Sequence, residues 1–444
     1  MISRRVFVVA PVVMSVAMLG GAQAPRPIPE SPAQLQRPSR APTSRSPGGE
    51  IHALTVSESQ AGSEVPAIIS GNLLTTVEPS EACYFMSIAI GTDGLPVISY
   101  LDSRNDALKV VHCGNTACSS GNTVTTVDRD FPPIEQSTSI TIGADGLPVI
   151  AYGVAVLKVA HCGNAECTSG NVVTAVGGAD TDGQGISIRI GADGLPVVSY
   201  YDGGDLKGAH CGNVACSAGN TLTTVDSAGD VGQYNSLAIG ADGLPVISYY
   251  DGTYFGVGDL KVAHCGNAVC TSGNMVTTVD SGPWMGGSTS LAIGPDGLPV
   301  ISYGDPGYSA LKVAHCGNID CTSGNTLTTV DPEGDARDTS ITIGMDGLPV
   351  ISYCDLYSAL KVAHCGDAAC TSGNTVATID VGESVLKPPN WSNVGRWNSI
   401  VIGADGLPVI TYYGGVDAGV KVAHCGTPSC TAFNVRRHLQ KQGP

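Results

Sequence analysis

Cysteine and histidine have the most regular spacing of any reactive residues in this 444-residue chain. Fourteen of the sixteen cysteines form seven Cys-x4-Cys pairs, and a histidine directly precedes each pair. This grouping suits two chemistries: a disulfide across a tight hairpin, or a zinc site. Because a zinc site here would have only three ligands, we predict disulfides, with the histidines packing beside them. The pairs are Cys113/Cys118, Cys162/Cys167, Cys211/Cys216, Cys265/Cys270, Cys316/Cys321, Cys365/Cys370 and Cys425/Cys430.

Aromatic residues and aspartates form a second set with binding chemistry. Aromatic rings stack on the apolar faces of sugars, and carboxylate and phenol oxygens hydrogen-bond to hydroxyls. Arg189 joins this set because a guanidinium binds anions, whereas other repeats carry Ala, Thr or Val at its position. The alternatives are that the aspartates cap turns, the rings cover the fold and Arg189 pairs with a carboxylate. The predicted ligand-binding residues are Trp284, Trp391, Trp397, Tyr201, Tyr250, Tyr413, Asp202, Asp251 and Arg189.

We predict no catalytic residue. The aspartates recur from repeat to repeat, so no repeat carries a distinctive acid and base pair. The Gly-x-Asp-Gly runs are hairpin turns rather than a nucleotide-binding motif. We also predict no cofactor, since an Asp before Gly is usually a turn former; calcium is the alternative at these acidic positions.

A repeat of about 50 residues must position these groups, since the His-Cys pair recurs at intervals of 49, 49, 54, 51, 49 and 60 residues. One unit, residues 235–280, has four short segments rich in Val, Ile, Thr and Tyr, separated by Gly, Asp or Asn turns. They are Ser236–Ile239, Pro245–Tyr250, Leu260–Cys265 and Met275–Val279. Four antiparallel strands per unit are typical of propeller blades, so we predict an all-β, seven-bladed β-propeller.

The strand that completes the last blade is expected to come from the N-terminal side of the chain. Residues 71–78 match the fourth strand of a unit that has no preceding three strands, so we predict that they complete the seventh blade and close the ring. Residues 433–439 are a poorer copy of the same strand and compete for this place.

The up-and-down strand order defines two rims. The turn rim carries the first-to-second connections, with their Gly-x-Asp-Gly-Leu-Pro turns, and the Cys-x4-Cys connections. The loop rim carries the other connections, which vary in length and contain nearly all the aromatic residues. Cys83 and Cys354 are expected in loop-rim connections of blades 1 and 6, either paired or free. Binding is predicted on the loop rim, because rigid scaffolds commonly carry their sites on variable loops.

The repeat resembles a known kind of protein. The run Pro-Val-Ile-Ser-Tyr-Tyr-Asp at 245–251, followed by Asp-Leu-Lys-Val-Ala at 259–263, is similar to tandem repeats of large secreted bacterial propeller proteins, over about 370 residues. The resemblance implies the fold and export but no defined activity. The Cys pair in every unit departs from those plainer repeats.

The first 50 residues are predicted to lie outside the propeller. Residues 1–24 have the basic start, apolar run and small residues of an export signal. Arg4 and Arg5 leave the general and twin-arginine routes open, and an uncleaved anchor is the alternative. Residues 25–50, rich in Pro, Ser and Arg, are predicted to be a linker, and residues 51–444 the propeller. We therefore expect a periplasmic, cell-surface or extracellular protein with no membrane span in its mature chain.

Charge limits the partners. Residues 51–444 hold 16 basic and 37 acidic residues, a formal charge of −21, which disfavours nucleic acid. We predict a monomeric, exported, non-catalytic binding module that recognises a carbohydrate or surface polymer on the loop rim. The alternatives are a scaffold for another envelope or secreted protein, and a propeller glycan hydrolase or lyase, which would need converging carboxylates.

Overall fold

The computed structural model describes residues 71–80, 82–129, 137–154, 156–177, 185–254, 257–282, 287–305, 310–334, 336–355, 359–381, 393–415 and 418–431. The chain divides into two units, residues 1–65 and 66–444, and every described residue belongs to the second. The predicted export signal, the linker and residues 433–439 lie outside the described residues, so those predictions stay untested. No helix among the described residues is long and apolar enough to cross a membrane.

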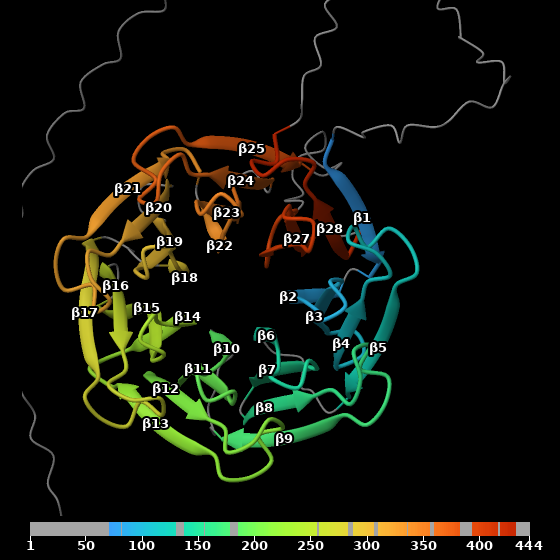
Figure 1. The fold of residues 1–444 in the computed structure, drawn as a ribbon, viewed down its shortest axis with the longest axis horizontal. Helices are drawn as coiled ribbons and strands as arrows, with labels where there is room; N and C mark the ends of the chain where they lie inside the picture. The colour runs from blue at the N-terminus through green and yellow to red at the C-terminus, as the bar shows by residue number, and fades with distance from the viewer. Residues whose placement is uncertain are drawn as a thin grey trace, which may run out of the picture. The chain divides into compact units, whose positions relative to one another are not determined.

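Seven four-stranded antiparallel sheets form a ring, which confirms the all-β, seven-bladed propeller (Figure 1). Blade 1 contains β2 (Cys83–Ile90), β3 (Pro96–Asp102), β4 (Ala107–His112) and β5 (Thr123–Asp128). Blade 2 contains β6 (Ser137–Ile142), β7 (Pro148–Val154), β8 (Val156–His161) and β9 (Val172–Gly177). Blade 3 contains β10 (Ile186–Ile190), β11 (Pro196–Asp202), β12 (Asp205–His210) and β13 (Thr221–Asp226). Blade 4 contains β14 (Val231–Ile239), β15 (Pro245–Tyr254), β16 (Val257–His264) and β17 (Met275–Gly282).

The remaining blades repeat this order, with the innermost strand first (Figure 1). Blade 5 contains β18 (Gly287–Ile293), β19 (Pro299–Asp305), β20 (Ala310–His315) and β21 (Thr326–Asp331). Blade 6 contains β22 (Arg337–Ile343), β23 (Pro349–Cys354), β24 (Leu360–His364) and β25 (Thr375–Asp380). Blade 7 contains β26 (Ser399–Ile402), β27 (Pro408–Tyr413), β28 (Val420–His424) and, as its outer strand, β1 (Leu73–Glu78).

Two devices close the ring. Strand β1 pairs antiparallel with β28, from Leu73 opposite His424 onwards, as predicted from residues 71–78. Around the channel, the serine on each innermost strand accepts a hydrogen bond from a backbone N–H of the next blade, at 3.0–3.4 Å. The serines are Ser87, Ser139, Ser187, Ser236, Ser290, Ser340 and Ser399. The seventh of these bonds, from Ile88 to Ser399, joins blade 7 to blade 1.

A fully buried tyrosine from the second strand occupies each blade junction. In five junctions its hydroxyl donates to the aspartate at or near the end of the outer strand of the preceding blade, at 2.6–2.7 Å. These pairs are Tyr152–Asp128, Tyr249–Asp226, Tyr303–Asp280, Tyr353–Asp331 and Tyr412–Asp380. The Tyr100 hydroxyl donates instead to Glu78 Oε2 at 3.3 Å. The outer strand that precedes Tyr200 ends in Gly177, which has no carboxylate to accept such a bond. These tyrosines and aspartates therefore join the blades.

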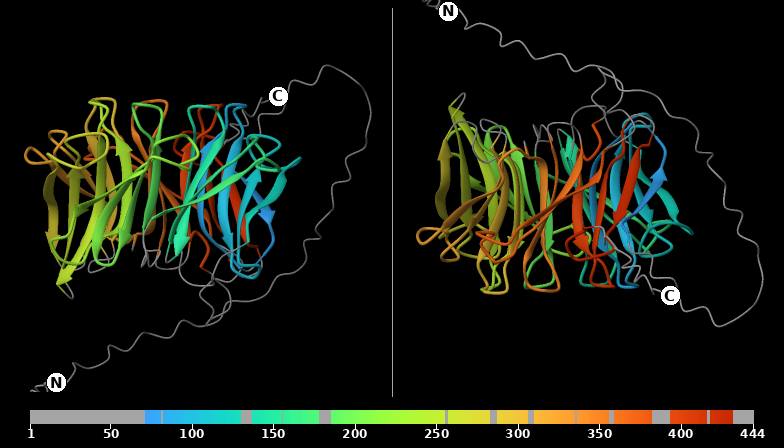
Figure 2. Two further views of the ribbon diagram at one scale, coloured as in Figure 1. Left: turned by 90° about the horizontal axis from the view of Figure 1, so that it is seen from below. Right: turned by 90° about the horizontal axis from the view of Figure 1, so that it is seen from above.

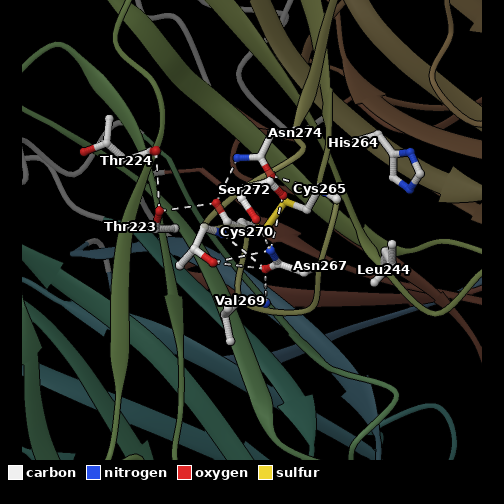
Figure 3. The surroundings of a disulfide bond; sticks show 12 residues. Thr223, Thr224, Leu244, His264, Cys265, Asn267, Val269, Cys270, Ser272 and Asn274 are labelled. Atoms are coloured by element: carbon white, nitrogen blue, oxygen red, sulfur yellow. Dashed lines mark hydrogen bonds between the residues drawn. A yellow bond between two sulfur atoms is a disulfide. The ribbon is translucent and has the colours of Figure 1, made fainter.

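The turn rim is built from a repeated Asp, His and disulfide. Figure 3 shows the disulfide of blade 4 with His264 nearby. In blade 1, Asp93 Oδ1 accepts the N–H of Leu95 at 3.0 Å, which forms the turn, and Asp93 Oδ2 lies 2.8 Å from His112 Nε2. The other six blades have the same Asp–His pair, with distances of 2.7–2.9 Å. The prediction that the histidines only pack was incomplete, because each faces the turn aspartate of its own blade.

All seven predicted disulfides are present, with Cα–Cα distances of 4.7–4.9 Å. The zinc alternative is therefore wrong, because the sulfur atoms bond to each other. The bridges are Cys113–Cys118, Cys162–Cys167, Cys211–Cys216, Cys265–Cys270, Cys316–Cys321, Cys365–Cys370 and Cys425–Cys430. The bridged loops also join blades: Thr223 of blade 3 donates its hydroxyl to Cys270 O of blade 4 at 3.3 Å (Figure 3). The side view shows the strands running between the two rims (Figure 2).

The second cysteine of each bridge has a backbone conformation that the sequence pattern did not reveal. The predicted hairpin connection is present, and at this one position φ lies between 50° and 55°, in the left-handed region. The residues concerned are Cys118, Cys167, Cys216, Cys270, Cys321, Cys370 and Cys430. Each donates its N–H to the carbonyl three residues earlier, at 3.0 Å. The bridge and this turn bond together hold a conformation that is rare for a residue with a side chain.

Asp367 provides a test of one bridged loop, since it stands where blades 1 to 5 have Asn. Hydrogen bonds from Thr371 and Ser372 lower the pKa of Asp367 from 3.8 to about 2. Because the folded pKa is depressed, this contribution is present above pH 4 and is lost as the pH falls through the folded pKa. The wild-type protein should therefore lose a little stability in acid, under about 1 kcal/mol because the group is exposed. We expect Asp367→Asn to lack this loss of stability. Chemical denaturation between pH 2 and pH 5 would measure the free energy of unfolding of both proteins. The same dependence of this free energy on pH in both proteins would contradict the prediction.

Candidate ligand-binding site at the loop-rim mouth of the channel

A bulge near the loop-rim end of the innermost strand gives this fold its variable position. In five blades the residue two before the channel serine is in the left-handed backbone region, with φ between 50° and 54°. We call Phe85, Tyr234, Ser288, Asp338 and Trp397 the mouth residues. Left-handed backbone costs a non-glycine residue about 1–2 kcal/mol. Strain of this kind is often retained at functional sites, so these positions mark the candidate site.

Contacts from the next blade hold the bulges. Thr138 Oγ1 donates to Phe85 O at 2.8 Å, and Thr289 Oγ1 donates to Tyr234 O at 2.9 Å. Asn398 Nδ2 donates to Asp338 O at 2.7 Å. These mouth residues are thus fixed through their backbone, which leaves the identity of the side chain free to vary.

Four aromatic rings gather where blade 7 meets blade 1. The centroid of the Trp397 ring lies 4.9 Å from that of Tyr84, 5.4 Å from Phe85 and 5.5 Å from Tyr413. Tyr413 is buried beneath, at 4% exposure, whereas Tyr84, Phe85 and Trp397 are half-buried. We call these four residues the aromatic cluster. It offers three partly exposed rings on two blades.

An ion pair fixes the loop that carries Trp397. Asp338 Oδ2 accepts hydrogen bonds from Arg396 Nε at 2.5 Å and from the Trp397 backbone N–H at 3.0 Å. The Arg396 guanidinium lies 5.3 Å from the Trp397 ring centroid. Burial alone would lower the pKa of Arg396, but Asp338, and more weakly Cys354 and Tyr234, raise it. Arg396 therefore stays protonated beside the Trp397 ring, and Asp338 offsets its charge.

A second aromatic group belongs to blades 3 and 4. The rings of Tyr234 and Tyr250 lie 6.2 Å apart, with Tyr234 43% exposed and Tyr250 9%. Tyr201 donates its hydroxyl to Asp230 Oδ1 at 2.6 Å. Tyr234 of this group and Trp397 of the aromatic cluster occupy the same bulge position on the innermost strands of their blades. The aromatic side chains therefore form two groups around one opening rather than one pocket.

The predicted aspartates lie beside lysines. Asp202 Oδ2 lies 3.5 Å from Lys207 Nζ, and Asp251 Oδ2 lies 2.6 Å from Lys261 Nζ. Burial alone would raise the pKa of Asp251, but hydrogen bonds from Lys261 and Thr253 outweigh it and the pKa lies below its ordinary value. Asp251 thus stays ionised and is held by Lys261 and Thr253.

One carboxyl group near Asp251 has the opposite shift. Burial and the nearby charge of Asp251 raise the pKa of Asp259. Asp259 lies on the third strand of blade 4, whereas the described channel lining comes from the innermost strands. The raised pKa therefore does not mark an acid at the channel.

The structure describes seven of the nine predicted binding residues. Trp397 and Tyr413 come together, Tyr201 and Tyr250 are largely buried in the second group, and Arg189 lines the channel. Trp284 and Trp391 lie outside the described residues. The predicted set omitted Tyr84, Phe85 and Tyr234, which are mouth residues or their neighbours. An alignment of the repeats on the channel serine would have revealed the varying position, but not its left-handed backbone.

The two unpaired cysteines are free and buried. Cys83 begins β2 and Cys354 ends β23, so their expected place in loop-rim connections was wrong. Burial raises the pKa of the Cys83 thiol to about 12, and burial also raises that of Cys354. A raised pKa keeps both thiols protonated and unreactive at neutral pH.

These features define a seven-bladed β-propeller with a channel mouth lined by aromatic residues. No protein-family model matches the chain, and no curated protein matches it. Among solved structures, the BP39L lectin from Burkholderia pseudomallei is similar, with a TM-score of 0.56 and 12% identity over 77% of this chain and 95% of the lectin. The polysaccharide lyase Uly1 has a TM-score of 0.51 and 9% identity over 78% of this chain and 90% of the lyase. At these identities the similarity shows the fold alone.

Proposed function

We propose that this protein is an exported, non-catalytic binding module that recognises a carbohydrate or surface polymer at the channel mouth. The observation that supports the proposal most directly is the aromatic cluster, in which three partly exposed rings from two blades converge. Rings held rigidly in this way present apolar faces to a sugar at little cost in conformational entropy. The seven disulfides are consistent with an oxidising environment outside the cytoplasm.

One further observation favours binding over hydrolysis, and another is compatible with both. Hydrolysis needs a pair of carboxyl groups with opposed pKa values at the reaction centre. At the cluster, Asp338 already accepts hydrogen bonds from Arg396 and Trp397. The similar solved propellers include a lectin and a polysaccharide lyase, so the architecture accommodates glycans in either mode.

A glycan array probed with the wild-type protein and its variants tests the proposal. We expect Tyr84→Ala and Trp397→Ala to weaken binding of any glycan that scores by at least about tenfold, as loss of an anchoring ring usually does. Trp397→Phe should retain part of the affinity. The control is Tyr254→Ala, which removes a ring that is 74% exposed at the end of β15 and should bind as the wild type does.

Circular dichroism must show each variant folded, because Trp397 also packs against the core. Wild-type protein that binds no glycan would contradict the proposal and favour the protein-scaffold alternative. Binding that is unchanged in both folded cluster variants would show that the glycan binds elsewhere.

A further inference from the structure

The central channel is a separate feature from the aromatic cluster. Its cavity has a volume of about 630 Å³ and is lined by the innermost strands of all seven blades. The lining consists of Ser, Thr, Asn and small or medium apolar side chains, apart from Arg189, which is the one charged residue among the described lining. In a domain with a formal charge of −21, a lone cation in the channel is an unexpected placement.

Arg189 has no carboxylate partner among the described residues. Its one hydrogen bond runs from Nη1 to the backbone oxygen of Ile188 at 2.7 Å. Burial lowers the pKa of Arg189, and no nearby acidic group offsets this effect. The ion pair that sequence reasoning considered more common is therefore absent from the described part of the chain. Arg189 is half-buried in the channel wall and has no counter-charge among the described residues, which points to an anion supplied from outside the chain.

The surroundings of Arg189 leave room for such an anion. The equivalent positions of the other blades hold small or β-branched side chains: Ala89, Thr141, Ala238, Ala292, Thr342 and Val401. Thr141 lies in the blade preceding that of Arg189, and Thr141 and Thr342 both line the cavity. Their hydroxyl groups are hydrogen-bond donors that line the same cavity as Arg189. A guanidinium and hydroxyl groups that line one cavity are the donors that an oxyanion requires.

We propose that the channel binds a small monocarboxylate on Arg189. The planar guanidinium matches a carboxylate with two parallel hydrogen bonds, and the apolar residues of the lining accommodate a short alkyl group. A single negative charge is favoured over a dianion, because the strongly acidic domain repels each added charge. This inference does not rest on the glycan proposal, since it uses a different set of residues.

Acetate is the probe. The midpoint of thermal unfolding should rise with acetate relative to chloride at the same ionic strength, since a ligand that binds only the folded state stabilises it. Arg189→Met, which retains the length of the side chain, should abolish this rise. Arg189→Lys should bind acetate about tenfold more weakly, as measured by calorimetric titration, because it retains the charge without the planar fork.

Arg104→Met is the matched control, since it removes one positive charge from an exposed position and should respond to acetate as the wild type does. An equal acetate response in Arg189→Met, or no response in the wild type, would overturn the site. A larger rise with sulfate than with acetate would overturn the choice of a monocarboxylate. Each comparison is made within one variant, with and without the probe, so an altered stability of the variant does not affect it.

Discussion

Reduction of the seven disulfides is expected to unfold the propeller under conditions in which the oxidised protein is stable. Each bridge joins residues five apart in sequence. A loop this short restricts the unfolded chain by about 2 kcal/mol. Seven such contributions are comparable to the roughly 5–15 kcal/mol that typically separates folded from unfolded domains.

The second cysteine of each pair adds to this effect. Its left-handed backbone is one that a free cysteine would avoid, and the bridge holds it in place. The loop carbonyl also accepts a hydrogen bond from the neighbouring blade, as Cys270 O does from Thr223. Loss of the bridges should therefore loosen both the loops and the blade junctions.

Protein reduced in denaturant and returned to a reducing buffer provides the measurement. We expect it to lack the β-sheet circular dichroism signal of a control that is refolded with its bridges intact. Mass spectrometry after alkylation must confirm that all fourteen bridged cysteines are reduced. Fully reduced protein with an unchanged unfolding midpoint would contradict the prediction.

Asp280→Ala is expected to destabilise the protein by about 2–4 kcal/mol. Asp280 Oδ2 accepts hydrogen bonds from Tyr303 at 2.6 Å and from Lys312 at 2.5 Å, and so joins blade 4 to blade 5. Its removal leaves the charge of Lys312 without this partner at a site where only 14% of that side chain is exposed. The free energy of unfolding, obtained by urea denaturation, measures the loss.

Two companion variants test the assigned cause. In the triple variant Asp280→Ala, Tyr303→Phe, Lys312→Met, no polar group of the trio is left behind, so much of the stability should return. The control Asp205→Ala removes a more exposed carboxylate that lies 3.6 Å from Lys207, and should cost under about 1 kcal/mol. Equal losses for Asp280→Ala and Asp205→Ala would show that the junction carboxylate has no special role.

Sequence reasoning predicted most of the architecture because the fold is made of local units. Strand alternation, Asp-Gly turns and the Cys-x4-Cys spacing lie within one repeat, and seven copies of them define seven blades. The disulfides were predicted for the same reason, since the two cysteines of a bridge are close in the chain. The N-terminal position of β1 also followed from its match to a fourth strand.

The roles of individual side chains were harder to predict, because contacts between blades decide them. Asp128 and Asp280 lie in the outer strands β5 and β17 and carry the chemistry of a binding site, yet the tyrosine of the next blade donates a hydrogen bond to each of them. The pairing joins residues 23 and 24 positions apart across a junction whose geometry the repeat pattern does not contain. The same limit applied to Asp251, which Lys261 holds from the neighbouring strand.

The sequence by itself determined the blade count, the strand order, the bridges and the rim on which variation gathers. Only the tertiary structure decided that Trp397 joins Tyr84 and Phe85 across the closure of the ring, and that Arg189 lies in the channel without a carboxylate partner among the described residues. Local patterns specify what a strand is. The side chains that meet around a closed ring depend on its curvature and on the bulges of its inner strands, which contacts from the next blade hold in place.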